Sequence, residues 1–273
     1  MTTRILIIVG GLILAVGAVL VVLKMRGRSN AGGAAGTATS QPGPGPEAMA
    51  DLKDLLFADQ SVEELLSMVQ STQTPGPNDP LYLFASSLTA ARANKTDEAR
   101  NQLQQALALP GAESRMQLWA WNGLRMLGEQ PPPEVADKVQ GVVCELHNEA
   151  GVGTLAAYTD GRAQWIGGQG ALIVWDVPGS DAEISAHITR LLKAAEPLVK
   201  SAPLSDTHRI PEPEMENFRV SILTYSGIRT VEVYGPSMEE SQPIAAVLDA
   251  SVSLLNALIR KGETESKQKP SPR

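Results

Sequence analysis

The stretch TLAAYTDGRAQWIGGQGALIVWD, residues 154–176, decides the fold class of this 273-residue chain. Its branched and aromatic residues recur with a period of two, and glycine-containing turns separate short runs of them. Asp160-Gly161 lies between two such runs, and Asp-Gly is a strong hairpin signal because glycine accepts the positive φ of tight turns. The stretch therefore predicts consecutive antiparallel strands.

The flanking segments extend this pattern over residues 139–262. VQGVVCELHN (139–148) reads as a preceding strand, and residues 218–235 read as a later hairpin. Two helices are expected between and after them. One covers 181–200, with Ser180 and Glu183 as a capping box and a kink or end at Pro197, and the other covers 243–262 and stops at Gly262. The order ββββ-α-ββ-α predicts an α+β domain, an antiparallel sheet with helices on one face.

Residues 47–138 have a helical period instead and predict a small all-α module. An apolar stripe begins the module, and Ser61 with Glu64 forms a capping-box pattern before a second helix. Two antiparallel helices joined near Asn94-Lys95 follow, and a further helix is expected near 113–127.

The helical pair at about 80–113 resembles a degenerate tetratricopeptide (TPR) repeat. Ala99, Leu103 and Ala106 stand at the spacing of the signature residues of that motif's second helix, and Ser87 is the small residue where the helices cross. The early tryptophan and the first-helix glycine of the motif are missing. The resemblance implies a repeat-like module that needs cover from a neighbouring helix.

Residues 154–176, with the helix and hairpin after them, also resemble the C-terminal part of uncharacterised bacterial proteins. This resemblance implies no activity.

Residues 5–23, ILIIVGGLILAVGAVLVVL, predict a single-pass transmembrane helix. Nineteen consecutive residues lack a polar side chain, and at about 1.5 Å per residue they span roughly 28 Å, close to a bilayer core. Three cations follow by residue 28, so residues 1–28 read as an anchor with a basic flank, in a bacterial inner membrane. A cleaved signal peptide is the alternative, since residues 31–36 are small.

The excess of Lys and Arg after the anchor predicts a cytoplasmic body, with a periplasmic body as the alternative. Residues 29–46 read as a flexible Gly/Ala/Pro linker, and residues 263–273 read as a disordered polar tail. The only cysteine, Cys144, permits no internal disulfide.

The charge balance excludes one class of partner. The chain carries a net charge of −7, and residues 1–28 hold four cations and no carboxylate, which leaves −11 for the body. Nucleic-acid binding depends mainly on phosphate neutralisation by Lys and Arg. We therefore expect no nucleic-acid partner.

The residues that could carry chemistry form no complete motif. Cys144 and His147 are three apart on a strand, so they should point to opposite faces and form neither a metal site nor a nucleophile–base pair. His187 falls on a helix, and His208 lies beside Arg209 in a loop.

The remaining candidates have structural explanations. Gly167-Gly168-Gln169 reads as a hairpin turn, and Asp160 and Asp176 lie near turns. Four further carboxylates are expected on solvated helix faces, namely Asp54, Asp59, Glu63 and Glu64. We therefore predict no catalytic residue, no cofactor and no metal ligand.

Together these patterns predict a membrane-anchored protein-interaction or scaffold protein that is not an enzyme. Two alternatives stay open, a small-ligand sensor and an enzyme with a site assembled around His208, Arg209 and Asp160. An exposed apolar groove would support the first reading. A deep pocket with converging polar groups would support the alternatives.

Overall fold

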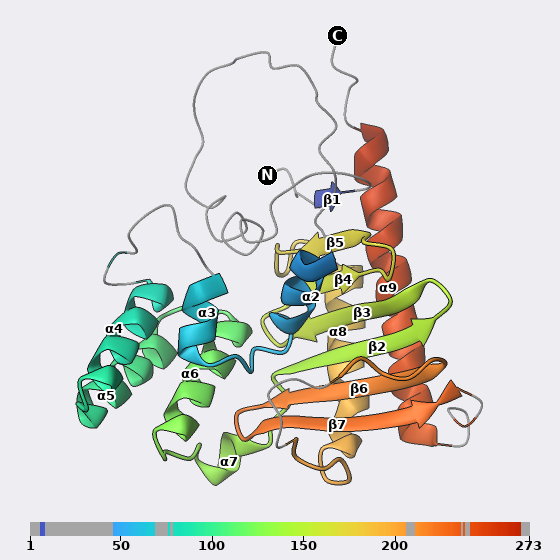
Figure 1. Ribbon diagram of the computed structural model, residues 1–273. Helices are drawn as coiled ribbons and strands as arrows, with labels where there is room; N and C mark the ends of the chain where they lie inside the picture. The colour runs from blue at the N-terminus through green and yellow to red at the C-terminus, as the bar shows by residue number, and fades with distance from the viewer. Residues whose placement is uncertain are drawn as a thin grey trace, which may run out of the picture.

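The computed structural model describes residues 6–8, 46–68, 76, 79–205, 211–235, 237 and 241–268. Within these residues an antiparallel sheet has two long helices against one face and a helical module against part of the other (Figure 1). The predicted α+β class is confirmed.

The sheet has the strand order β1-β5-β4-β3-β2-β6-β7, and its paired strands run antiparallel. The predicted order ββββ-α-ββ-α is confirmed from residue 141 onward. Gly161 has a φ of 84° in the Asp160-Gly161 turn, as the hairpin prediction requires. The strands are β1 Leu6–Ile8, β2 Gly141–Asn148, β3 Gly151–Tyr158, β4 Ala163–Ile166, β5 Leu172–Trp175, β6 Asn217–Thr224 and β7 Gly227–Tyr234.

Helices α8 (Ala182–Ala195) and α9 (Gln242–Gln268) lie side by side behind the sheet in Figure 1. Their inward residues, such as Leu191 and Leu254, share a buried cluster with one face of the strands. A 3-10 turn, Glu196–Leu198, ends α8 at Pro197 as predicted.

Two predicted helix boundaries are wrong. Asp181, not Ser180, caps α8, because its carboxylate accepts from the amides of Glu183 and Ile184 at 3.0 and 3.2 Å. Helix α9 does not stop at Gly262 but continues to Gln268, into the tail predicted to be disordered. The Glu, Lys and Gln residues after Gly262 are good helix formers, and one helical glycine costs only about 1 kcal/mol.

Helix α9 is also long and apolar enough, over Gln242–Gly262, to cross a membrane. Its apolar side instead packs on the sheet, with Ile244, Val247 and Leu258 at most 2% exposed. We therefore assign α9 to the core of the folded body.

The helical module contains α2 Pro46–Asp54, α3 Val62–Met68, α4 Pro80–Arg92, α5 Thr96–Ala108, α6 Ser114–Met126 and α7 Pro133–Ala136. The predicted capping box is confirmed, since the Ser61 amide donates to Glu64 Oε2 at 2.9 Å and the Glu64 amide donates to Ser61 Oγ at 3.2 Å. The antiparallel pair α4–α5 is confirmed, with Ser87, Ala99 and Leu103 buried. Its TPR resemblance stays a prediction.

The module and the sheet share one hydrophobic cluster, contrary to the expectation of helices on one face only. Leu56, Leu65 and Trp119 belong to the same cluster as Val143 and Tyr158 of the sheet. The Tyr158 hydroxyl also donates to the Leu56 carbonyl at 2.6 Å. The physical reason is that β2 and β3 carry apolar residues on both faces at this end, so each face needs cover.

The predicted transmembrane helix over 5–23 is not supported by the structure. Its described residues, Leu6–Ile8, form β1 and pair with β5 at the sheet edge. The β-branched residues Ile7 and Ile8 favour an extended strand, and β5 offers backbone groups to pair with. Residues 9–23 and the linker up to residue 45 lie outside the described residues.

Candidate functional site

An open pocket of about 330 Å³ lies between α9 and one end of the sheet, on the face that α8 and α9 cover. Side chains from β2, β3, β4 and β6 and from α9 line it. The walls are mainly apolar and include Leu146, Leu155, Trp165, Phe218, Val252 and Leu255. Leu146 and Val252 are 37% and 49% exposed, so the pocket opens to solvent along an apolar border.

The pocket has a buried apolar end and an exposed polar end. Cys144, Leu155 and Phe218 at its base are at most 4% exposed. Asn148 and Gln169 are exposed and stand at the other end, at the β2–β3 and β4–β5 turns. The pocket is therefore an apolar trough with amide groups at its mouth.

The predicted turn at Gly167-Gly168-Gln169 is confirmed, and it forms part of this pocket. Strand β4 ends at Ile166 and β5 begins at Leu172, and the Gly167 amide donates to the Ala171 carbonyl at 2.7 Å. Gly170 has a φ of 84°, which explains a glycine at that position. The triplet forms the turn through its backbone, and its two glycines add no side chain to the pocket wall.

Cys144 and His147 point to opposite faces of the sheet, as predicted. Cys144 lies in the cluster beneath α8 and α9, where burial and the nearby Glu145 carboxylate raise the pKa of its thiol. His147 Nδ1 lies 2.7 Å from the Pro213 carbonyl. The two side chains cannot act on one ligand.

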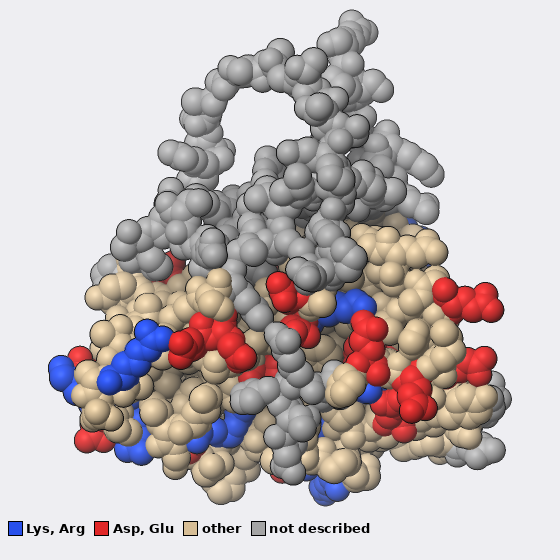
Figure 2. Space-filling model, viewed as in Figure 1, with Lys and Arg blue, Asp and Glu red and all other residues tan. Residues whose placement is uncertain are grey.

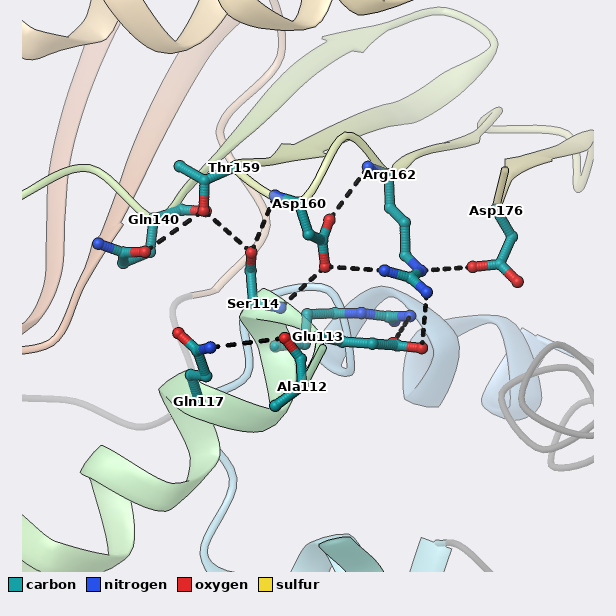
Figure 3. Close-up of polar contacts among 10 residues, drawn as sticks. Ala112, Glu113, Ser114, Gln117, Gln140, Thr159, Asp160, Arg162 and Asp176 are labelled. Carbon is teal, nitrogen blue, oxygen red and sulfur yellow. Dashed lines mark hydrogen bonds and ion pairs between the residues drawn. The ribbon is translucent and has the colours of Figure 1, made fainter. Parts of the chain in front are cut away.

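A second cluster joins the helical module to the β3–β4 hairpin (Figure 3). Asp160 Oδ2 accepts from the Ser114 amide at 2.8 Å, so the hairpin caps the N-terminus of α6. Ser114 Oγ accepts from the Asp160 amide at 3.1 Å and lies 2.9 Å from the Thr159 hydroxyl. We call Glu113, Ser114, Thr159, Asp160, Arg162 and Asp176 the latch.

Arg162 lies at the centre of the latch. Its guanidinium contacts Asp176 at 2.5 Å, Asp160 at 3.1 Å and Glu113 at 3.2 Å. Burial disfavours the charged form of Arg162, but the three carboxylates outweigh it and raise the Arg162 pKa. For Glu113, burial outweighs Arg162 and Arg115, so the pKa of Glu113 is raised. These charges are paired with one another.

A third cluster crosses the sheet face opposite α8 and α9. Glu145, Arg219 and Glu232 stand opposite one another on β2, β6 and β7. Arg219 contacts Glu232 at 2.7 Å and Glu145 at 3.5 Å. Figure 2, viewed as Figure 1, shows acidic side chains over the helical module at the left and over the strands at the centre and right.

Burial has the largest effect on the pKa of Glu145. It raises the Glu145 pKa to about 7, although Arg219 and Lys53 favour the charged form. Lys53 in turn contacts Glu212 at 2.9 Å. Sequence reasoning missed Glu145 and Arg219, because only the strand register brings them together.

The other candidate residues belong to the latch, form ion pairs or lie outside the described residues. Asp160 and Asp176 belong to the latch, and His187 Nε2 lies 3.8 Å from Glu183 on α8. Glu63 pairs with Arg92 at 2.6 Å. His208 and Arg209 lie outside the described residues, so their proposed grouping with Asp160 has no structural description.

Within the described part of the chain, no group of three or more His, Cys, Asp or Glu side chains is arranged to hold a metal ion. Comparison of the chain with protein-family models, with curated proteins and with solved structures finds no match. The pocket beside α9 is the candidate binding site.

Proposed function

We propose that this chain is a membrane-anchored interaction protein that holds a binding partner near the bilayer. The observation that carries the proposal is the open pocket between α9 and the sheet, with Leu146 and Val252 exposed at its border. Isolated exposed apolar residues are ordinary, but apolar residues gathered around a concave site mark binding.

The charged clusters favour binding over catalysis at this site. A general acid or base has to reach the reacting group within hydrogen-bond distance. In the latch and in the Glu145 cluster, the carboxylates pair with Arg162 and Arg219. Both clusters lie away from the pocket, whose lining is mainly apolar.

The membrane anchor belongs to the same proposal. As a helix, residues 5–23 are long enough to span a bilayer, which requires Leu6–Ile8 to leave their pairing with β5, and Lys24, Arg26 and Arg28 favour a cytoplasmic body. Helix α2 begins at Pro46, and a flexible linker of the length of residues 29–45 has a root-mean-square span of roughly 23 Å. The pocket would then work close to the membrane surface.

Site-specific photocrosslinking in native membranes tests this function. A benzophenone amino acid replaces Val252 in the full chain, and the matched control carries it at Met126, which is 60% exposed on the helical module. We expect a discrete protein adduct from position 252 and none of the same mass from position 126.

Two results would overturn the proposal. Identical adduct patterns from both positions would show non-specific surface contact. Recovery of the uncrosslinked chain in the soluble fraction, with a mature N-terminus after residue 30, would show that the mature protein has no membrane anchor.

A further inference from the structure

Gly153 lies in the floor of the pocket, and the fold does not require glycine there. Its backbone is outside the left-handed region, unlike that of Gly151. A Cβ added at Gly153 would meet Trp165 Nε1 at 3.8 Å and the Leu146 carbonyl at 4.0 Å, which are ordinary contacts. Glycine inside a strand weakens it, so a strand glycine without a local reason marks a place where another molecule approaches the backbone.

The neighbouring glycines differ, because the fold explains each of them. Gly151 has a φ of 92°, and a Cβ at Gly167 would lie 2.9 Å from the Trp165 ring. A Cβ at Gly168 would lie 2.2 Å from the Ala150 carbonyl. Gly153 alone among these four keeps space open that the protein itself does not use.

The polarity of the pocket indicates what fills this space. The base at Cys144, Leu155 and Phe218 is buried and apolar, whereas the mouth carries the amides of Asn148 and Gln169. Asn148 Oδ1 already accepts from the Ala150 amide at 2.9 Å, which leaves its Nδ2 group to donate. A ligand with a long apolar part and a terminal hydrogen-bond acceptor matches this gradient.

The described residues that line the pocket include no Lys, Arg or His that could pair with a charged carboxylate head group. Glu149 is exposed in the β2–β3 turn, next to Asn148. A carboxylate head would meet this like charge, but an uncharged carbonyl would not. The volume of about 330 Å³ lies near the lower end of the usual range of roughly 300–1,000 Å³ for ligand sites, which suits a single chain.

We propose that this pocket binds one linear acyl chain with an uncharged carbonyl head group, such as an acyl ester. The chain lies over Gly153 toward Cys144, and its carbonyl accepts from Asn148. The inference rests on the proposed function, since it names the chemistry that the partner brings to the same site. The acyl group belongs either to a lipid or to a lipid-bearing protein.

Photolabelling with a defined probe tests the site. The full chain is placed in lipid nanodiscs with a diazirine-bearing fatty-acid methyl ester, and labelled peptides are mapped by mass spectrometry. We expect adducts on pocket residues from β2 and α9, competed by unlabelled ester. Labels confined to residues 5–23, or spread evenly over the surface, would overturn the proposal.

The substitution Gly153→Val tests the site more directly, because its Cβ makes only ordinary contacts and its two methyl groups occupy space in the trough. We expect at least a tenfold loss of pocket labelling with an unchanged or higher thermal midpoint. Gly76→Val is the control, since nothing lies within 4 Å of a Cβ there. If Gly153→Val lowers the midpoint, Gly153→Ala takes its place, and undiminished labelling in the folded variant contradicts the proposal.

The crosslink at position 252 separates this inference from the proposed function. A protein adduct without probe labelling leaves the interaction protein standing and removes the acyl site. If the probe labels the pocket and position 252 gives only a lipid-sized adduct, the acyl group belongs to a lipid and the proposed protein partner is contradicted. A protein adduct that the ester displaces identifies a lipid-bearing protein.

Discussion

At the scale of single residues, Glu145 is the titratable group most affected by its surroundings. Burial raises its pKa from 4.5 to about 7 in the folded chain, against the opposing effect of Arg219 and Lys53. A carboxyl with a raised folded pKa contributes stability that is fully present below its unfolded pKa. That contribution is lost as the pH rises through its folded pKa.

We therefore predict that Glu145→Gln flattens the pH dependence of stability between about pH 4.5 and 8. Between these limits, the wild type should lose on the order of 1–3 kcal/mol more than the variant. Urea unfolding of the full chain at several pH values measures this difference. Glu98→Gln on the surface of α5 is the control, and an equal change of slope there would contradict the assignment to Glu145.

His147 provides a second prediction at this scale. Its Nδ1 lies 2.7 Å from the Pro213 carbonyl, on the sheet face opposite the pocket. His147→Ala should cost about 1–2 kcal/mol of unfolding free energy, the ordinary value of one such contact with its packing. Loss of partner crosslinking without any loss of stability would instead indicate a functional histidine.

At the scale of elements, α6 depends on a cap from a distant hairpin. Helix α6 has no cap from its own N-cap side chain, and Asp160 supplies the acceptor for the Ser114 amide. Asp160 also accepts from the Arg162 amide at 3.0 Å and pairs with its guanidinium. One carboxylate therefore holds both the helix start and the hairpin turn.

We predict that Asp160→Ala lowers the unfolding free energy by about 2–4 kcal/mol, because it removes a cap and leaves a half-buried Arg162 with fewer partners. Denaturant unfolding followed by circular dichroism measures the loss. Asp97→Ala, which removes an exposed pair with Arg100, should change it by less than about 0.5 kcal/mol. Equal effects of the two substitutions would show that Asp160 contributes no more to the free energy of unfolding than an exposed ion pair does.

The same region shows what sequence reasoning can reach for an element. Asp160-Gly161 identified the hairpin because turn chemistry is local, and Ser61 with Glu64 identified a capping box for the same reason. The second role of Asp160 depends on Ser114, 46 residues away, and no local pattern marks that contact. For α8, Ser180 and Asp181 are both good caps, and only geometry decides between them.

At the scale of the whole molecule, the predicted order of elements is confirmed from residue 141 onward, and the two predicted units share one hydrophobic cluster. Alternation indicated one buried face of each strand, yet Val143, Ala156 and Tyr158 bury the other face against the helical module. The continuous apolar runs in β2 and β3 are the sequence pattern that indicates burial of both faces. The pocket could not be predicted, because its walls join α9 to β6 and to β2, β3 and β4, and the last three lie more than 70 residues earlier in the chain.

This shared cluster leads to the last prediction, that the helical module and the sheet unfold together. Native-state hydrogen exchange of the full chain in rising denaturant should give the slowest amides of α6 and β3 the same free energy of opening, since either unit alone exposes Trp119 or Tyr158. Tyr158→Phe removes the bond to the Leu56 carbonyl and should lower both values equally, by about 1 kcal/mol. If α6 opens at a lower free energy than β3, or if the variant affects β3 alone, the units are independent domains and the latch only tethers them.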